Sequence, residues 1–282
     1  MAEIGKYNVL TAAKSTPQGM YLTDEEGNEI LLPNKYVPHT CSVGTRLKVF
    51  IYLDSEDRII ATTKSPKATA GDFACLKVKD VNNIGAFLDW GLEKDLFVPY
   101  KEQRRTLYQG ESCVFYIYVD KETNRLLASS KLNKHLTKNI EQISSGDEVE
   151  VLISSKTDLG YNCIVNNKYS GLIYQNEAFK ELQAGDKLKA FAKKVRHHDG
   201  KIDISLQKAG YKKVEGLPEQ ILKKLKLQAG FMPVNSKTPP DKIYNLFGVS
   251  KKTFKMAIGA LYKERKIEIT ETGIKLISKP EN

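Results

Sequence analysis

The chain has 282 residues, of which 41% are hydrophobic and 28% charged, and its formal net charge is +10. This composition is typical of a globular protein and excludes an intrinsically disordered one. No stretch approaches the roughly 18 consecutive apolar residues of a membrane-spanning helix. Met1–Leu10 lacks the basic and apolar regions of a signal peptide, so we expect a cytoplasmic protein without a membrane partner.

Residues 1–206 contain an internal repeat, marked in each copy by four anchor residues separated by 14, 14 and 11 positions. The anchors are Gly5, Gly19, Pro33 and Gly44 in the first copy, Gly71, Gly85, Pro99 and Gly110 in the second, and Gly146, Gly160, Tyr174 and Gly185 in the third. Flanking residues also agree, as in Val49–Asp54 and Phe115–Asp120. A repeat of this kind indicates similar domains in tandem.

Each copy has the pattern of several short strands, because Val and Ile alternate with polar residues and glycines separate the runs. Strand–turn–strand joints are predicted at Asp80–Gly85 and Asp158–Gly160, since glycine accepts the positive φ of a tight turn. About 65 residues with roughly five strands favour a small Greek-key barrel of the OB type over a sandwich. We therefore predict three five-stranded barrels, at residues 1–64, 70–131 and 144–207.

The segments between the copies differ in character. Lys64–Ala70 contains Pro66 and small residues, which is typical of a linker. In residues 132–143 the apolar residues fall at positions 132, 136, 140 and 143, which is a helical spacing. This spacing predicts a helix that connects the second barrel to the third.

From Leu217 onwards the hydrophobic period changes from two residues to about 3.6, which predicts helices. The first follows Pro218, the second opens at Pro240, and the third runs from about Lys251 to Glu264 with Ser250 as its N-cap. Two short strands are predicted at 266–270 and 273–277. This order predicts a winged-helix domain at residues 216–280. The fold class is thus mainly β, with an α/β domain at the C-terminus.

Positive charge is concentrated in the C-terminal domain. Residues 207–282 contain 16 Lys and Arg against 7 Asp and Glu, whereas residues 1–206 contain 28 against 27. Such a segment favours polyanionic partners, although a lysine-rich solvated surface has the same composition. Three of its lysines begin the third helix, where the helix dipole disfavours cations, and this suggests a use. The residues predicted to contact phosphate are Lys251, Lys252, Lys255, Arg265 and Lys266.

Gly85–Pro99 reads GAFLDWGLEKDLFVP and resembles the S1 RNA-binding domain, a subclass of the OB fold. Over essentially its whole length, including SKKTFKMAIGALYKERKI at Ser250–Ile267, the chain is similar to the conserved virulence factor B family. This resemblance implies three S1-type domains, a winged helix, and an RNA-binding role in post-transcriptional regulation.

The S1 resemblance also implies which aromatic side chains stack on bases. S1 domains have aromatics around a Gly-Ala step and a His near the third strand. Phe87 matches the aromatic after this step, Tyr21 takes its place in the first copy, and Tyr174 matches the His position in the third. The alternative for each is burial in a core, as is usual for an aromatic in an alternating strand.

Two further features of the second copy have open interpretations. Trp90, the only tryptophan, is flanked by Asp89 and Gly91, which favours core or loop packing over a base platform. Arg104 and Arg105 follow the strand that ends at Pro99 and either bind phosphate or form an ordinary exposed pair.

No enzyme motif is present in the sequence. His39, His135, His197 and His198 have no Ser, Cys or carboxylate constellation beside them, and a Gly-rich phosphate loop and an HExxH helix are both missing. The cysteines are Cys41, Cys75, Cys113 and Cys163, which form no CxxC pair, so we expect reduced, buried thiols and no metal or other cofactor.

Three functions remain. The first is an RNA-binding regulator, in which the barrels bind single-stranded RNA and the basic winged helix supplies most of the electrostatic affinity. The second is a DNA-binding transcription factor with the winged helix in a major groove. The third is a ribosome-associated scaffold that binds protein.

Overall fold

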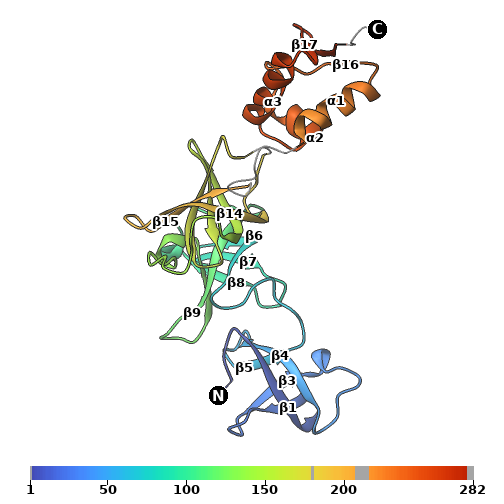
Figure 1. The fold of residues 1–282 in the computed structure, drawn as a ribbon. Coiled ribbons are helices and arrows are strands. Elements are labelled where there is room, and N and C mark those ends of the chain that lie inside the picture. Colours follow the sequence, from blue (N-terminus) through green and yellow to red (C-terminus); the bar gives the residue numbers. More distant parts are fainter. Residues whose placement is uncertain (1, 179–180, 207–215, 278–282) are drawn as a thin grey trace. The chain divides into compact units, whose positions relative to one another are not determined.

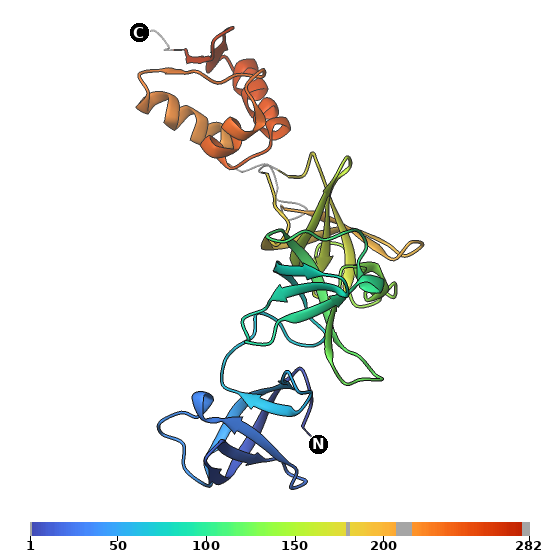
Figure 2. The same ribbon diagram turned by 180° about the vertical axis from the view of Figure 1, so that it is seen from behind.

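The computed structural model describes residues 2–178, 181–206 and 216–277. The chain folds as two compact units (Figures 1 and 2). The first spans residues 1–173 and 182–204 and contains three β-barrels, and the second holds the C-terminal helices. The predicted fold class, with three barrels followed by a winged helix, is confirmed.

Each barrel is closed and has five strands, as predicted. Barrel 1 consists of β1 (Tyr7–Thr16), β2 (Gly19–Thr23), β3 (Glu29–Pro33), β4 (Arg46–Leu53) and β5 (Ile59–Thr62). Barrel 2 consists of β6 (Phe73–Asn82), β7 (Gly85–Asp89), β8 (Leu96–Pro99), β9 (Ser112–Val119) and β10 (Leu126–Ser129). Barrel 3 consists of β11 (Glu148–Thr157), β12 (Gly160–Val165), β13 (Tyr169–Tyr174), β14 (Lys187–Arg196) and β15 (Lys201–Ser205).

The strand order is the same in all three barrels, and the third strand pairs with the fifth in parallel. Leu31 on β3 is paired with Ile60 on β5, and Phe97 on β8 with Leu127 on β10. In barrel 3, β13 and β15 pair in the same way. This parallel contact distinguishes the Greek-key barrel from a simple up-and-down barrel, and it confirms the topology that the repeat predicted.

The repeat extends to an irregularity in the first strand of each barrel. The register shifts in β1 between Ala12 and Lys14, in β6 between Val78 and Asp80, and in β11 between Ile153 and Ser155. A bulge bends a strand and increases its twist. In barrel 1, β4 pairs with β1 at Tyr7–Thr11, before the bulge, and β2 pairs with β1 at Thr11–Thr16, across the bulge.

Gly85 shows why one anchor of the repeat is glycine. Its φ is 155°, and a Cβ there would lie 2.3 Å from the carbonyl oxygen of Val98 on the neighbouring strand. Gly19 has the same environment in barrel 1, where the added atom would lie 2.1 Å from the Leu32 oxygen. The anchor thus allows the hairpin backbones to approach closely.

The core of barrel 2 continues into barrel 1 through Trp90. This side chain is only 2% exposed, and its indole nitrogen donates a hydrogen bond to the Lys94 carbonyl oxygen at 2.7 Å. Its ring meets those of Phe50 and Tyr52 edge-on, with centroids 5.7 and 6.4 Å away. The predicted core packing of Trp90 is confirmed. The Trp90 side chain packs between barrels 1 and 2 and does not fill the core of barrel 2 alone.

The predicted connecting helix at residues 132–143 is wrong. This segment contains only the 3₁₀ turn η3 (Leu132–Lys134) followed by irregular backbone. The Thr137 hydroxyl accepts a hydrogen bond from the Asn139 amide, and the Asn139 side chain accepts one from the Glu141 amide. Such local side-chain acceptors compete with helical hydrogen bonds. The apolar spacing instead reflects separate burial of Ile140 and Ile143.

The second unit contains the winged helix in the predicted order, with one strand that the sequence did not predict. Its elements are α1 (Leu217–Leu227), β16 (Phe231–Met232), α2 (Pro240–Phe247), α3 (Lys251–Lys263), β17 (Ile267–Ile269) and β18 (Ile274–Leu276). The additional strand, β16, is the edge of a sheet ordered β16-β18-β17. As predicted, the Ser250 hydroxyl caps α3 by accepting from the Thr253 amide at 3.1 Å.

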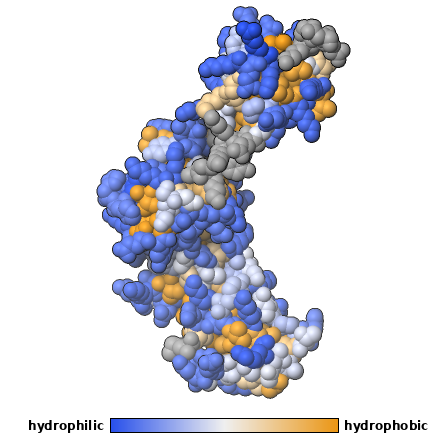
Figure 3. Space-filling model, viewed as in Figure 1, coloured by the Kyte–Doolittle hydropathy of each residue, from blue (hydrophilic) through white to orange (hydrophobic). Residues whose placement is uncertain are grey.

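The face of α3 that was predicted to be buried is buried in the structure. Phe254, Ala257, Ile258 and Leu261 all belong to the core of the second unit. On the side of the molecule drawn in Figure 3, hydrophobic residues occupy separate areas of a mainly hydrophilic surface. This distribution is expected when most large apolar side chains fill the cores.

Candidate nucleic-acid interface

Phe87 lies on the outer side of barrel 2, in the middle of β7. Its neighbours Ala86 and Leu88 are completely buried, so the alternation of the strand directs Phe87 outward, and it is half-buried. It is paired with Phe97 on β8, and the two ring centroids are 5.1 Å apart with planes tilted by 32°. The two rings form an accessible aromatic surface.

Phe97 was not singled out from the sequence. The signal that identifies it is the alternation of β8, in which Leu96 and Val98 are buried and Phe97 between them is half-buried. The same period of two that directs Phe87 outward in β7 directs Phe97 outward in β8, and so predicts that the two rings lie side by side.

This aromatic pair lies in a cleft of about 480 Å³. Ile84, which is 55% exposed, and Leu127 of β10 also line this cleft. The volume falls within the range of about 300–1,000 Å³ that is usual for ligand clefts. An exposed apolar and aromatic surface of this kind can receive a flat unsaturated ring by stacking.

Tyr21 occupies the same position of the repeat in barrel 1, on β2, and is also half-buried. The ammonium group of Lys14 lies over its ring, 4.9 Å from the centroid. The position opposite Tyr21 on β3 is Leu31 instead of an aromatic residue. Barrel 1 therefore offers a smaller aromatic surface than barrel 2, and a cation already covers part of it.

Barrel 3 has a different surface at this position. The residue in place of Phe87 is Asn162, whose amide nitrogen donates to the Ser155 hydroxyl at 3.2 Å. The adjacent Tyr161 is only 1% exposed and belongs to the interior. Tyr174, the remaining candidate for stacking in this copy, is half-buried at the end of β13.

Arg104 and Arg105 differ in their contacts. The Arg105 guanidinium binds both carboxylate oxygens of Glu111, at 3.0 and 2.6 Å, and its hydrogen bond to that carboxylate raises the arginine pKa. Arg104 is exposed, and within the described part of the chain its guanidinium has no hydrogen-bond or ion-pair partner. Of the two cations, Arg104 is the one available to a ligand.

The exposed face of α3 carries two of the predicted lysines. Lys252 and Lys255 are exposed, and Met256 and Tyr262, which are 52% and 56% exposed, lie on the same side of the helix. Lys251 is half-buried, and its ammonium group donates to the Lys237 carbonyl oxygen at 3.3 Å. This face thus combines positive charge with an exposed aromatic ring.

Arg265 and Lys266 do not join this cluster. They follow the C-terminus of α3, which has 13 residues, so they lie about 20 Å along the helix from its first turn. The Lys266 ammonium group is bound to Glu264 at 2.8 Å, and this hydrogen bond raises its pKa. The adjacent hairpin carries Glu268 and Glu271 together with Lys275, which is paired with Glu268, so it has no net positive charge to attract a phosphate.

Residues 2–178, 181–206 and 216–277 lack two further features. No helix among them has both the length and the apolar character needed to cross a lipid bilayer. No group of three or more His, Cys, Asp or Glu side chains in these ranges has an arrangement that would hold a metal ion.

Comparison with known families identifies the domains. Residues 4–64 and 70–131 each match the S1 domain, and residues 219–276 match the CvfB-like winged helix domain. S1 domains and winged helices are nucleic-acid-binding modules, so the chain is a multidomain nucleic-acid-binding protein.

Over most of its length the chain is similar to members of the conserved virulence factor B family. It is 25% identical to conserved virulence factor B of Staphylococcus aureus, over 82% of this chain and 79% of the relative. It is 27% identical to the Bacillus subtilis protein YitL, over 93% of this chain and 90% of the relative. A crystal structure of a multidomain protein with nucleic acid binding domains from Streptococcus pneumoniae aligns with 97% of this chain, at 24% identity and a TM-score of 0.43.

Proposed function

We propose that this protein binds single-stranded RNA and acts in post-transcriptional regulation. The observation that carries the proposal is the outward pair of Phe87 and Phe97 on an S1 domain, within a cleft of about 480 Å³. Unpaired bases can leave their own stack and lie on aromatic side chains, whereas the bases of a duplex cannot. An aromatic surface in a cleft therefore favours a single strand.

The winged helix supplies the electrostatic part of the interaction. Lys252 and Lys255 project from one exposed face of α3 beside Tyr262, so phosphate contact and stacking are available on the same surface. The β17–β18 hairpin carries Glu268, Glu271 and Lys275, so it offers no net positive charge for the phosphate contact that a wing makes with duplex DNA. This charge distribution favours RNA over the transcription-factor alternative.

Charge removal on α3 tests the proposal in the full chain. Lys252→Gln with Lys255→Gln should weaken binding of a labelled single-stranded RNA and reduce the slope of log K against log salt by about 1.4, since each phosphate contact on a single strand contributes about 0.7. Fluorescence anisotropy at several salt concentrations measures both quantities. The matched control is Lys223→Gln with Lys226→Gln, which removes two exposed lysines of α1.

Three results would contradict the proposal. The protein could fail to bind RNA at low salt, the α3 and α1 variants could behave identically, or duplex DNA of equal length could bind more tightly than RNA. Co-sedimentation with ribosomes that survives nuclease treatment, without affinity for free RNA, would instead support the scaffold alternative.

A further inference from the structure

The cleft that contains Phe87 and Phe97 has walls from two barrels. Besides residues of barrel 2, it is lined by Tyr52, Leu53, Ser55 and Asp57, which belong to β4 and the β4–β5 loop of barrel 1. Both barrels lie in the same compact unit. The barrel 1 loop therefore forms one side of the aromatic cleft of barrel 2.

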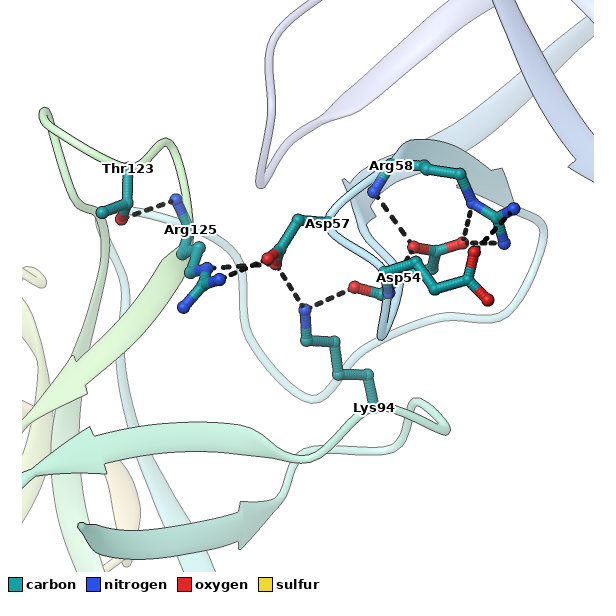
Figure 4. Close-up of polar contacts among 7 residues, drawn as sticks. Asp54, Asp57, Arg58, Lys94, Thr123 and Arg125 are labelled. Atoms are coloured by element: carbon teal, nitrogen blue, oxygen red, sulfur yellow. Dashed lines mark hydrogen bonds and ion pairs between the residues drawn. The ribbon is translucent and has the colours of Figure 1, made fainter.

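Asp57 connects this loop to barrel 2. Its carboxylate accepts hydrogen bonds from the Arg125 guanidinium, one of them at 3.0 Å, and the Lys94 ammonium group lies 3.4 Å away (Figure 4). The hydrogen bond from Arg125 lowers the pKa of the Asp57 carboxyl. Asp57 has a φ of 59°, a left-handed conformation that Asp and Asn tolerate better than most residues.

The corresponding arginine of barrel 1 is used differently. Arg58 and Arg125 both immediately precede the fifth strand of their barrels, but the Arg58 guanidinium turns back to Asp54 of its own loop, at 2.9 and 2.7 Å. Figure 4 shows this contrast, with Arg125 directed to Asp57 and Arg58 directed away from it. The contact between barrels is thus a specific use of Arg125 that the fold itself does not require.

The acidic side chains around the cleft are neutralised by partners. Asp57 is bound to Arg125, Asp95 to Lys79 at 2.9 Å, and Glu93 to Lys35. Because the carboxylates and the cations cancel, the cleft attracts phosphate weakly and suits an uncharged flat ring.

We infer that barrels 1 and 2 form one composite site, in which a nucleobase stacks on Phe87 and Phe97 against the β4–β5 loop of barrel 1. Asp57, Arg125 and Lys94 act as positioning residues that hold this loop in place. The inference rests on the proposed function and extends it, because the binding unit becomes a pair of barrels.

Asp57→Asn in the full chain separates this role from direct phosphate binding. If the carboxylate positions the loop, its neutralisation weakens binding of a labelled single-stranded RNA by about fivefold, because the loop must then be ordered by the ligand. If Arg125 and Lys94 bind phosphate themselves, the same change frees two cations and strengthens binding. Stronger or unchanged binding by Asp57→Asn would overturn the inference.

Arg125→Gln provides the second readout. A positioning role predicts weaker binding with an unchanged salt slope, whereas loss of a phosphate contact reduces the slope by about 0.7. Arg58→Gln is the matched control, since it removes an exposed arginine at the same place in the repeat, and its affinity should stay within twofold of the original. A reduced slope in Arg125→Gln, or an equal loss in Arg58→Gln, would contradict the composite site.

The experiment distinguishes failure of the inference from failure of the proposed function. If the unchanged protein binds RNA and Phe87→Ala weakens it, but Asp57→Asn and Arg125→Gln do not, only the composite site is wrong. If the unchanged protein does not bind RNA, the proposed function itself is wrong. Because these ion pairs are largely exposed, the variants should keep the original unfolding temperature, which verifies that they fold.

Discussion

Barrels 2 and 3 have the same strand order and the same bulge in the first strand, but their outer faces differ. At the centre of the second strand, barrel 2 carries Phe87 beside Phe97, whereas barrel 3 carries Asn162, which is bonded to Ser155. The repeat retains the residues that set the backbone and changes the residues that face outward. Recognition of a barrel from its anchors therefore does not identify a binding surface.

The largest effect should come from removal of a buried side chain that supports barrel 2. Trp90→Ala should lower the free energy of unfolding by about 4 kcal/mol, because it leaves a cavity between two barrels. Urea titration followed by circular dichroism measures the change, since the variant has no tryptophan fluorescence. Val165→Ala is the matched change in barrel 3, at the same position of the repeat, and should cost about half as much. A smaller loss for Trp90→Ala than for Val165→Ala would contradict this account.

A change on the outer face of barrel 2 should have an intermediate effect, and this effect should be on the affinity for RNA and not on the stability of the protein. Phe87→Ala should weaken binding of single-stranded RNA about tenfold, because one stacked base is worth about 1–3 kcal/mol. Asn162→Ala changes the equivalent residue of barrel 3 and should leave the affinity unchanged. Anisotropy titrations of both variants test the contrast, and equal affinities for the two would show that barrel 2 has no special role.

The smallest effect should distinguish two adjacent cations of barrel 2. Arg104→Ala should weaken RNA binding about twofold and reduce the salt slope by about 0.7, as expected for one phosphate contact. Arg105→Ala should leave the slope unchanged, because Glu111 already neutralises this guanidinium. If the ion pair of Arg105 opened on binding, Arg105→Ala would reduce the salt slope as well, and the salt dependence of the two variants decides between these outcomes.

Much of the architecture could be predicted from local patterns. The anchors correctly indicated closed five-stranded barrels because glycines such as Gly85 are required by close backbone contacts within one hairpin. The helices of the second unit were predicted from the period of 3.6 and from the Ser250 cap. Each of these signals lies within a short segment, so sequence periodicity is enough to detect it.

The remaining features depend on contacts between distant segments. The strand β16 has two residues and exists because Phe231 pairs with Lys275 of β18, which no local pattern reveals. The helix predicted at 132–143 does not form, although the apolar spacing of this segment is helical. Its Thr137 and Asn139 side chains accept hydrogen bonds from nearby backbone amides. The bond between Arg125 and Asp57 joins residues 68 positions apart, and Arg58 in the same repeat position shows that sequence alone did not specify it.

The position of Trp90 has a consequence for dissection of the protein. A fragment containing barrel 1 alone would leave the rings of Phe50 and Tyr52 without the indole that covers them, and a fragment that starts at barrel 2 would expose the indole to water. The smallest N-terminal fragment that keeps these rings buried is therefore the pair of barrels 1 and 2. Experiments that move domains of this protein into another protein should therefore keep barrels 1 and 2 together.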